Sequence, residues 1–168
     1  GNINFNFVHR ENEISIKNTN FYHKQIKLLS DKIIITTESD GKKIVKGDIR
    51  TEKNTVNLKI FKEIFENDLR FIKDQEITFE IKNKFSFLLQ KGKIKTLKHS
   101  SKIDLDNLSF KPEINLLKNY FNNYNDSILL KNNSITLKYE NKKFNIEGKS
   151  NYSFDTSFDK IEYKINKK

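Results

Sequence analysis

The sequence predicts a mainly β protein, an elongated and largely antiparallel curled sheet, built as a β-groove or an open sandwich, with two short helices. Three observations predict this class. First, apolar residues alternate with polar ones along most of the chain, which is the period of a strand with one buried face. Second, 14 Phe and 6 Tyr residues supply the groups that disordered segments lack, although 32% of the 168 residues are charged. We therefore expect residues 1–168 to form a single β-rich domain.

The third observation is an internal repeat, at about residues 25–48 and 127–149. Four apolar positions of the first stretch recur at an offset of 102, and Val45 and Gly47 recur as Ile146 and Gly148 at an offset of 101. The four pairs are Ile26 and Ile128, Leu28 and Leu130, Ile33 and Ile135, and Ile35 and Leu137. This spacing indicates one β unit used twice, which is typical of an additive scaffold. The chain also lacks methionine, so we expect it to be a segment of a longer protein.

The first part of the chain is predicted to contain five strands, separated by polar breaks and by the Ser39-Asp-Gly41 turn. Apolar residues are then spaced by three and four, which predicts a short amphipathic helix at about residues 58–67. These residues are Leu58, Phe61, Ile64, Phe65 and Leu69. The strands are expected at residues 3–7, 13–17, 26–29, 32–37 and 43–50. Val56, Leu58 and Ile60 continue the alternation, so Leu58 and Ile60 can alternatively finish a strand.

The middle of the chain is predicted to form a hairpin, two weaker strands and a second helix. Apolar alternation on both sides of Lys82-Asn-Lys84 predicts a turn there, between strands at residues 77–81 and 85–89. Weaker strands are expected at residues 93–98 and 102–110. Pro112 suits the first turn of a helix, because the amide that it lacks would be unpaired there.

The last part of the chain is predicted to be strands again, and no linker rich in Pro or Ser interrupts it. These strands are expected at residues 127–130, 134–140, 143–148, 151–154 and 160–166.

The formal net charge of +10 suggests a nucleic-acid binder, but the distribution of the charge favours another explanation. Lysines lie between apolar residues and so occupy the solvated faces of strands, where they also protect sheet edges. Arginine, which reads bases through its planar fork, occurs only at Arg10, Arg50 and Arg70. Nucleic acid is therefore not an expected partner, and a nucleic-acid binder would show binding that weakens steeply with salt.

The sequence gives little support for catalysis or metal binding. His9, His23 and His99 lie far apart without ligand spacing, and the chain has no cysteine. Asp104 with Asp106 fits the wet face of a strand. Asp155 and Asp159 flank Phe158 and resemble an acid/base pair, but two carboxylates in a loop are expected in a chain with 22 acidic residues. We predict that the protein is not an enzyme, with no catalytic residue, no metal site and no cofactor.

Strands that are apolar on one face need a cover for that face, and two short helices cover little of a large sheet. We expect the uncovered face to close as a barrel, to pack sheet on sheet, or to form a groove for acyl chains. Residue by residue, a dry and filled core is an equal alternative. The predicted lining residues are Ile33, Ile35, Ile77, Phe79, Ile81, Phe87, Leu89, Ile135, Leu137, Phe144 and Ile146.

The run from Ser134 to Gly148 and its counterparts Lys32–Thr37 and Ile44–Gly47 resemble the AsmA-like family, with its YhdP and TamB relatives. In that family, successive strands of this pattern build a long curled β-groove between the two membranes of a diderm bacterium. The resemblance implies a periplasmic segment whose parent is anchored in the inner membrane. It also implies phospholipid or another acyl-chain lipid as the ligand, neighbouring segments of the same parent as partners, and membrane contact through that parent.

Two further interpretations remain open. The chain is alternatively a structural or adhesive β domain of an exported surface protein, whose core is closed. A transport accessory for lipopolysaccharide would share the groove and differ only in its lipid. Whether the apolar face is sealed distinguishes the first alternative from a groove.

Overall fold

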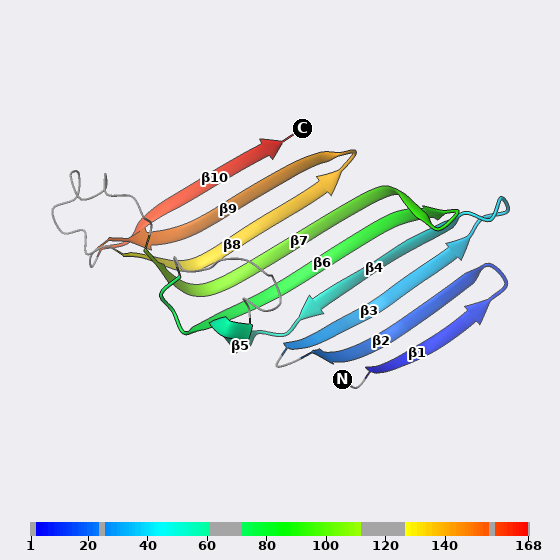
Figure 1. Cartoon of the computed structure of the whole chain (residues 1–168), viewed down its shortest axis with the longest axis horizontal. Coiled ribbons are helices and arrows are strands. Elements are labelled where there is room, and N and C mark those ends of the chain that lie inside the picture. Colours follow the sequence, from blue (N-terminus) through cyan, green and yellow to red (C-terminus); the bar gives the residue numbers. More distant parts are fainter. Residues whose placement is uncertain (1–2, 24–25, 61–71, 112–126, 155–156, 168) are drawn as a thin grey trace.

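A computed structural model shows an open, antiparallel sheet of ten strands (Figure 1). The structure describes residues 3–23, 26–60, 72–111, 127–154 and 157–167. Strand neighbours follow the order β1-β2-β3-β4-β6-β7-β8-β9-β10, and β5 pairs with β6 beside this path. The fold class predicted from the sequence, a mainly β chain with an open curled sheet, is thus confirmed. The strands are β1 Ile3–Arg10, β2 Glu13–His23, β3 Ile26–Thr37, β4 Lys43–Thr51, β5 Asn54–Asn57, β6 Glu76–Gln90, β7 Lys93–Phe110, β8 Ile128–Glu140, β9 Lys143–Ser153 and β10 Asp159–Lys167.

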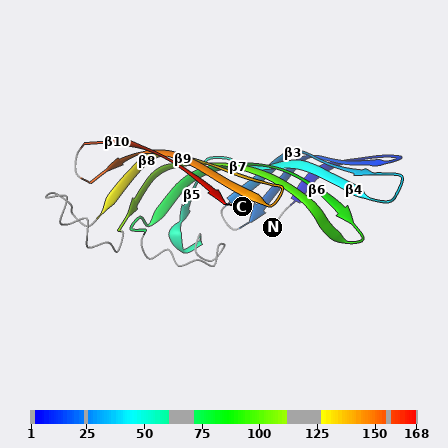
Figure 2. The same cartoon turned by 90° about the horizontal axis from the view of Figure 1, so that it is seen from above.

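The sheet is a single twisted and bowed layer when it is seen from above (Figure 2). This thin shape leaves a large surface in contact with water. The chain exposes 12085 Å², whereas a compact monomer of 20.0 kDa is expected to expose about 8,700 Å². Much of the apolar surface that a globular protein would bury is therefore only partly covered.

Both polar breaks within the repeat are β-bulges inside long strands, so the predicted division of each into two strands is wrong. In β3 the register moves from Leu29 to Ile33, while β4 moves only from Arg50 to Gly47. In β8 the same insertion of one residue lies between residues 131 and 134. An extra residue in one strand shifts the alternation and leaves the pairing on both sides intact. The apolar positions accordingly change from even to odd numbers across each break.

Polar side chains stabilise the two bulges in different ways. The carboxylate of Asp48 accepts hydrogen bonds from the backbone amides of Asp31 at 3.2 Å and Lys32 at 3.1 Å. In the second copy, the Ser150 hydroxyl donates to Asn133 Oδ1 at 2.6 Å, and both residues are buried. The Asp48 contacts satisfy two backbone amides at the bulge, and the Ser150 contact satisfies buried side-chain groups.

The predicted turn at Lys82-Asn-Lys84 is also wrong, because β6 runs through it without a break. Asn83 is two residues from Ile81 and from Phe85, so it takes an apolar-face position and the alternation continues through it without a shift. The chain turns instead at Lys91 and Gly92, where φ is 50° and 71°. Positive φ at both central residues is the requirement of the hairpin turn that matches strand twist.

The two weaker strands predicted after that turn are one long strand, β7. Its register against β6 shifts between the pair Phe87 with Leu97 and the pair Leu89 with Ile94, so β7 carries an extra residue there. Beyond this irregularity β7 pairs with β8 from His99 to Phe110. A central strand of this length joins both halves of the sheet.

Only part of the predicted helical segments falls within the described residues. Leu58–Ile60 are helical, in agreement with the predicted start of the first helix. The rest of that helix and the whole of the second, from Pro112 onward, lie outside the described residues.

The described residues contain one tightly packed cluster, formed where β5 pairs with β6. Val56, Ile77 and Phe79 are 1%, 2% and 2% exposed, and Ile26 joins them from β3. Leu58 and Ile72 pack against this cluster from outside the ladder. Such burial stabilises by about 1.5–3 kcal/mol for each large apolar side chain.

Substitution of Phe79 tests whether this cluster stabilises the sheet. We expect Phe79→Ala to lower the free energy of unfolding by about 3–5 kcal/mol, because it leaves a cavity in packed surroundings. Urea unfolding followed by circular dichroism measures this change. Phe7, which is 56% exposed on the edge strand β1, provides the control, and Phe7→Ala should change stability by less than about 1 kcal/mol. Equal losses for the two variants would contradict the assignment of the core.

The apolar face as the candidate functional site

The cross-strand register places every predicted lining residue on the same side of the sheet. Residues that are direct partners in a ladder project to the same face, and so do alternate residues within a strand. Ile35 is paired with Val45 and Val45 with Phe87, while Ile81 is paired with Ile103 and Ile103 with Ile135. The same reasoning places the other predicted residues on this side, which we call the apolar face.

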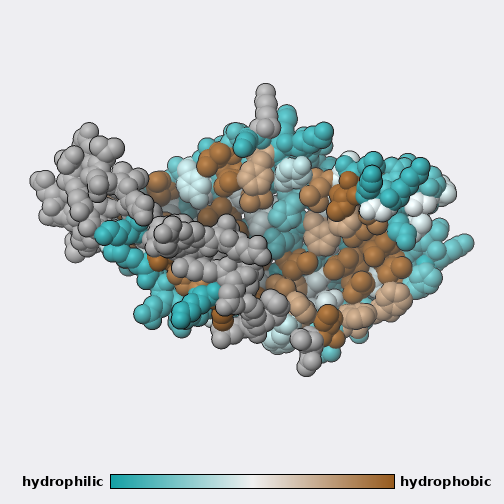
Figure 3. All heavy atoms as spheres, viewed as in Figure 1, coloured by the Kyte–Doolittle hydropathy of each residue, from teal (hydrophilic) through white to brown (hydrophobic). Residues whose placement is uncertain are grey.

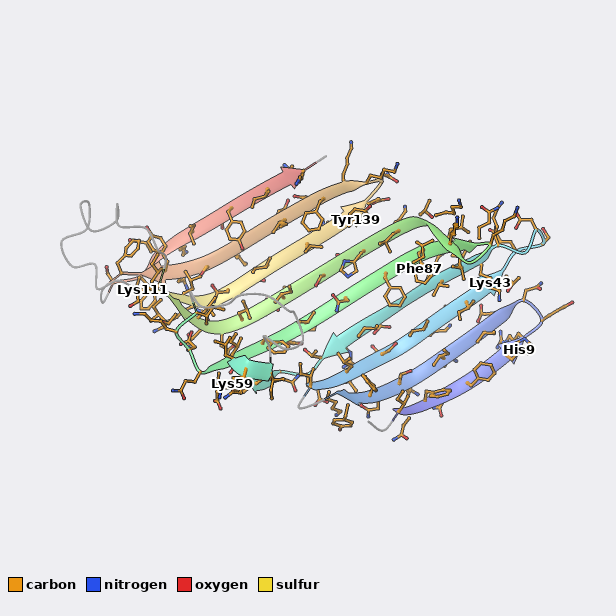
Figure 4. The ribbon with its side chains drawn as sticks, viewed as in Figure 1. His9, Lys43, Lys59, Phe87, Lys111 and Tyr139 are labelled. Atoms are coloured by element: carbon orange, nitrogen blue, oxygen red, sulfur yellow. The ribbon has the colours of Figure 1, made fainter. Side chains whose placement is uncertain are left out.

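The apolar face is turned toward the viewer in Figures 1 and 3 and lies on the concave side of the bow in Figure 2. Figure 3 shows brown, apolar atoms gathered over β1 to β6 and again over β8 to β10. In Figure 4, Phe87 and Tyr139 lie over the ribbon on this side. The face therefore extends over both copies of the repeat.

The predicted residues fall into two groups by burial. Ile77 and Phe79 are part of the packed cluster, so for them the alternative of a filled core describes the structure. The others are half-buried and retain contact with water. The half-buried residues are Ile33, Ile35, Ile81, Phe87, Leu89, Ile135, Leu137, Phe144 and Ile146.

Several members of the apolar face were not among the predicted lining residues, although they follow the same alternation in the sequence. Phe85, His99 and Tyr139 are among the members that were not predicted, and with the predicted Phe144 they are successive partners across four strands and form a mostly aromatic row. Other residues complete the face from the remaining strands. They are Phe7, Ile14, Ile16, Val45, Ile49, Leu97, Ile103, Leu105, Ile161, Tyr163 and Ile165.

The two repeat glycines leave space for a side chain from the next strand. A Cβ at Gly47 would lie 2.9 Å from Ile33 Cγ1 and 3.0 Å from Phe85 Cζ. A Cβ at Gly148 would overlap the ring of Tyr163. In each copy an aromatic residue therefore lies across a glycine of its neighbour strand, and the glycine keeps the apolar face flat at that point. Burial against this position raises the pKa of the Tyr163 phenol above its ordinary value.

The opposite face is charged. Lys82 with Glu80 at 2.7 Å, and Lys102 with Asp104 at 3.0 Å, are two of the ion pairs on it. Burial of Asp104 raises its pKa, but hydrogen bonds from Ser134 and Lys102 outweigh burial, and the net pKa lies below the ordinary value. Exposed pairs of this kind contribute about 0–1 kcal/mol each, so this face contributes solubility more than stability.

Polar groups also interrupt the apolar face. Asn83 and Ser101 are direct partners in its centre. Asn133, which is 5% exposed, donates from Nδ2 to the carbonyl oxygen of Leu105 at 3.3 Å. The row formed by Ile81, Ile103 and Ile135 crosses beside these groups and joins the two apolar regions.

The described residues that were considered for chemistry have ordinary surroundings. Among the described residues, no group of three or more His, Cys, Asp or Glu side chains could hold a metal ion. Asp106 forms an ion pair with Lys53 at 2.5 Å, and His9 is exposed on β1. Asp155, the possible partner of Asp159, lies outside the described residues.

Two depressions on the described surface are lined by both polar and apolar groups. One of about 440 Å³ is lined by Thr136, Glu147, Glu162 and Lys164 of the charged face, together with Gly148 and Tyr163. A second, of about 470 Å³, adjoins the packed cluster between Leu58 and Ile72. Neither brings together a nucleophile, a base and an oxyanion site, which an acyl-transfer centre would need.

Comparison with known proteins does not assign the chain to a family. No protein-family model, no curated protein and no solved structure matches it significantly. Within the part of the chain that the structure describes, no helix is long and apolar enough to span a membrane.

The packing of Tyr163 over Gly148 can be tested by adding a side chain at the glycine. We expect Gly148→Val to lower the free energy of unfolding by about 1–3 kcal/mol, because the new methyl groups displace the tyrosine ring. The double variant Gly148→Val with Tyr163→Ala should recover part of this loss, as measured by thermal unfolding. Additive losses in the double variant would contradict the contact.

Proposed function

We propose that the chain is a noncatalytic segment of an AsmA-like envelope protein that holds or conducts phospholipid acyl chains along its apolar face. One observation carries this proposal. The lining residues predicted from alternation share the concave face of an open sheet, and most of them stay half-buried rather than sealed. A surface of this kind favours a long, flexible apolar ligand over a small polar one.

The energetics of the surface support an acyl ligand. Transfer of apolar area out of water gains about 25 cal/mol for each Å², so an acyl chain laid along a row of Ile, Leu and Phe side chains binds without directed hydrogen bonds. The charged opposite face keeps the segment in solution while one face is occupied. Binding of this kind requires no covalent step.

The setting of the proposal follows from the family resemblance. It places the segment in the periplasm, within a parent that is anchored in the inner membrane and that contributes to the outer membrane. Further strands of that parent would continue the groove beyond β1, and lipid would move between membranes along it.

A second candidate function is a structural or adhesive domain of an exported protein. It is favoured by the packed cluster of Val56, Ile77 and Phe79, which shows that part of the apolar face is already filled by the chain itself. In that case the half-buried residues would serve as a contact surface for protein and would carry no lipid.

Native mass spectrometry of the protein purified from bacterial cells separates the two candidates. We expect phospholipid to co-purify at near-stoichiometric amount, and lipid extraction of the same sample should identify its class. Lipopolysaccharide in place of phospholipid would indicate the transport accessory. A lipid-free mass with a cooperative, lipid-independent thermal transition would reject acyl-chain binding and favour the structural domain.

A charged substitution on the apolar face tests the site directly. Phe87→Asp should reduce bound phospholipid by about tenfold or more while the sheet stays folded, because an unpaired carboxylate is costly beside an acyl chain. Ser86→Asp is the matched control, since the neighbouring residue of the same strand projects to the charged face. Ile135→Asp and Thr136→Asp form a second matched pair on β8. Equal lipid content in the members of both pairs would reject the apolar face as the site.

A further inference from the structure

The outer edge of β10 has no partner strand among the described residues, and the charges of the strand are self-complementary. All nine residues of Asp159–Lys167 are exposed, and β9 is the strand that pairs with them. Among the described residues, no strand pairs with the other side of β10. Alternate amides and carbonyls along that side therefore face solvent, and such an edge is a template for another strand. Figure 1 shows β10 at one border of the sheet.

When β10 pairs with β10 of a second copy in the antiparallel orientation, the charges of the two strands are complementary. With Tyr163 opposite Tyr163 of the second copy, each carboxylate of the strand meets an ammonium group. The pairs are Glu162 with Lys164, Asp159 with Lys167, Ile161 with Ile165, and Lys160 with Asn166. Each of these contacts occurs twice, as a two-fold axis requires.

The neighbouring registers are disfavoured by the same charges. A shift of two residues in one direction places Glu162 opposite Glu162, and a shift in the other places Lys164 opposite Lys164. Like charges that are direct partners destabilise a ladder. A shift of one residue would place the apolar side of one copy opposite the charged side of the other. The charges of β10 thus favour the centred register, which also pairs the whole strand, over the registers next to it.

The apolar side of β10 also gains from this pairing. Ile161, Tyr163 and Ile165 are 43%, 38% and 53% exposed, which is high for large apolar side chains within a sheet. In the centred register Ile161 of each copy lies opposite Ile165 of the other, so these side chains lose contact with water. Lys164 already pairs with Glu147 of β9 at 2.7 Å, and Glu162 of the second copy would approach it from the other side.

The opposite border of the sheet lacks this property. The edge strand β1, Ile3–Arg10, contains Arg10 and no carboxylate, so two copies of it offer no complementary charge. Complementary charges for self-pairing are therefore a property of β10 and not of β1.

We propose that two copies of this chain associate through β10 as an antiparallel pair centred on Tyr163, with the two-fold axis normal to the sheet. The pairing joins the two sheets into one layer and places both apolar faces on the same side. The association rests on β10 alone and is independent of whether the apolar face carries lipid.

Two charge variants and their mixture test this arrangement. Asp159→Lys with Glu162→Lys makes every charged side chain of β10 positive, and Lys164→Glu with Lys167→Glu makes the positions opposite them negative. By sedimentation velocity, we expect the native chain to be a dimer. Each variant alone should be a monomer at the same concentration, with a dissociation constant raised by about tenfold or more. An equimolar mixture should form a heterodimer, because every charged contact is then between opposite charges.

Control variants exclude a general effect of charge. Glu11→Lys with Glu38→Lys changes the net charge by the same amount, and both residues are exposed near turns away from β10. This control should stay dimeric. A monomeric native chain would overturn the proposal, and so would dimers of either β10 variant alone or a mixture that stays monomeric. Circular dichroism of each variant verifies that the sheet is folded.

Discussion

The antiparallel register, which runs unbroken in direction from β1 to β10, is the constraint on which the rest of the structure depends. Direct partners in a ladder share a face, so one strand's alternation is useful only if its neighbour is in phase with it. Ile35, Val45 and Phe87 on three neighbouring strands illustrate this phase. The alternation of apolar and polar residues within each strand is a weak, local property. Because all strands are in phase, it produces one apolar and one charged surface across the whole sheet.

The bulges keep neighbouring strands in phase within both copies of the repeat. In β3 and in β8 the alternation shifts by one residue, and the extra residue absorbs the shift without ending the strand. Different polar groups stabilise the two sites, a carboxylate at Asp48 and a hydroxyl with an amide at Ser150 and Asn133. The position of the bulge is thus kept between the copies while its chemistry differs.

A single layer has consequences for function, because it cannot bury its apolar side by itself. The exposed area of 12085 Å² exceeds that of a compact protein of this mass, and the packed cluster around Phe79 seals one part of the face. The remaining half-buried rows are where a ligand or a partner gains the most free energy. The edge strands offer a second, different kind of contact, through unpaired backbone groups and through the order of charges on β10.

The sequence by itself determined the β class, the alternation that assigns the lining residues to one side of each strand, and the repeat of the glycine-terminated hairpin. These are local properties, because the alternation of a strand and the conformation of a turn depend on residues only a few positions apart in the chain. Only the tertiary structure decided that Lys82-Asn-Lys84 continues a strand, that the breaks in β3 and β8 are bulges, and that Phe79 is packed while Phe87 is partly open. A polar break has the same local pattern in a turn and in a bulge, and the outcome depends on whether a distant strand is in register beside it. Burial likewise depends on what lies across the face, which no periodicity within a strand can express.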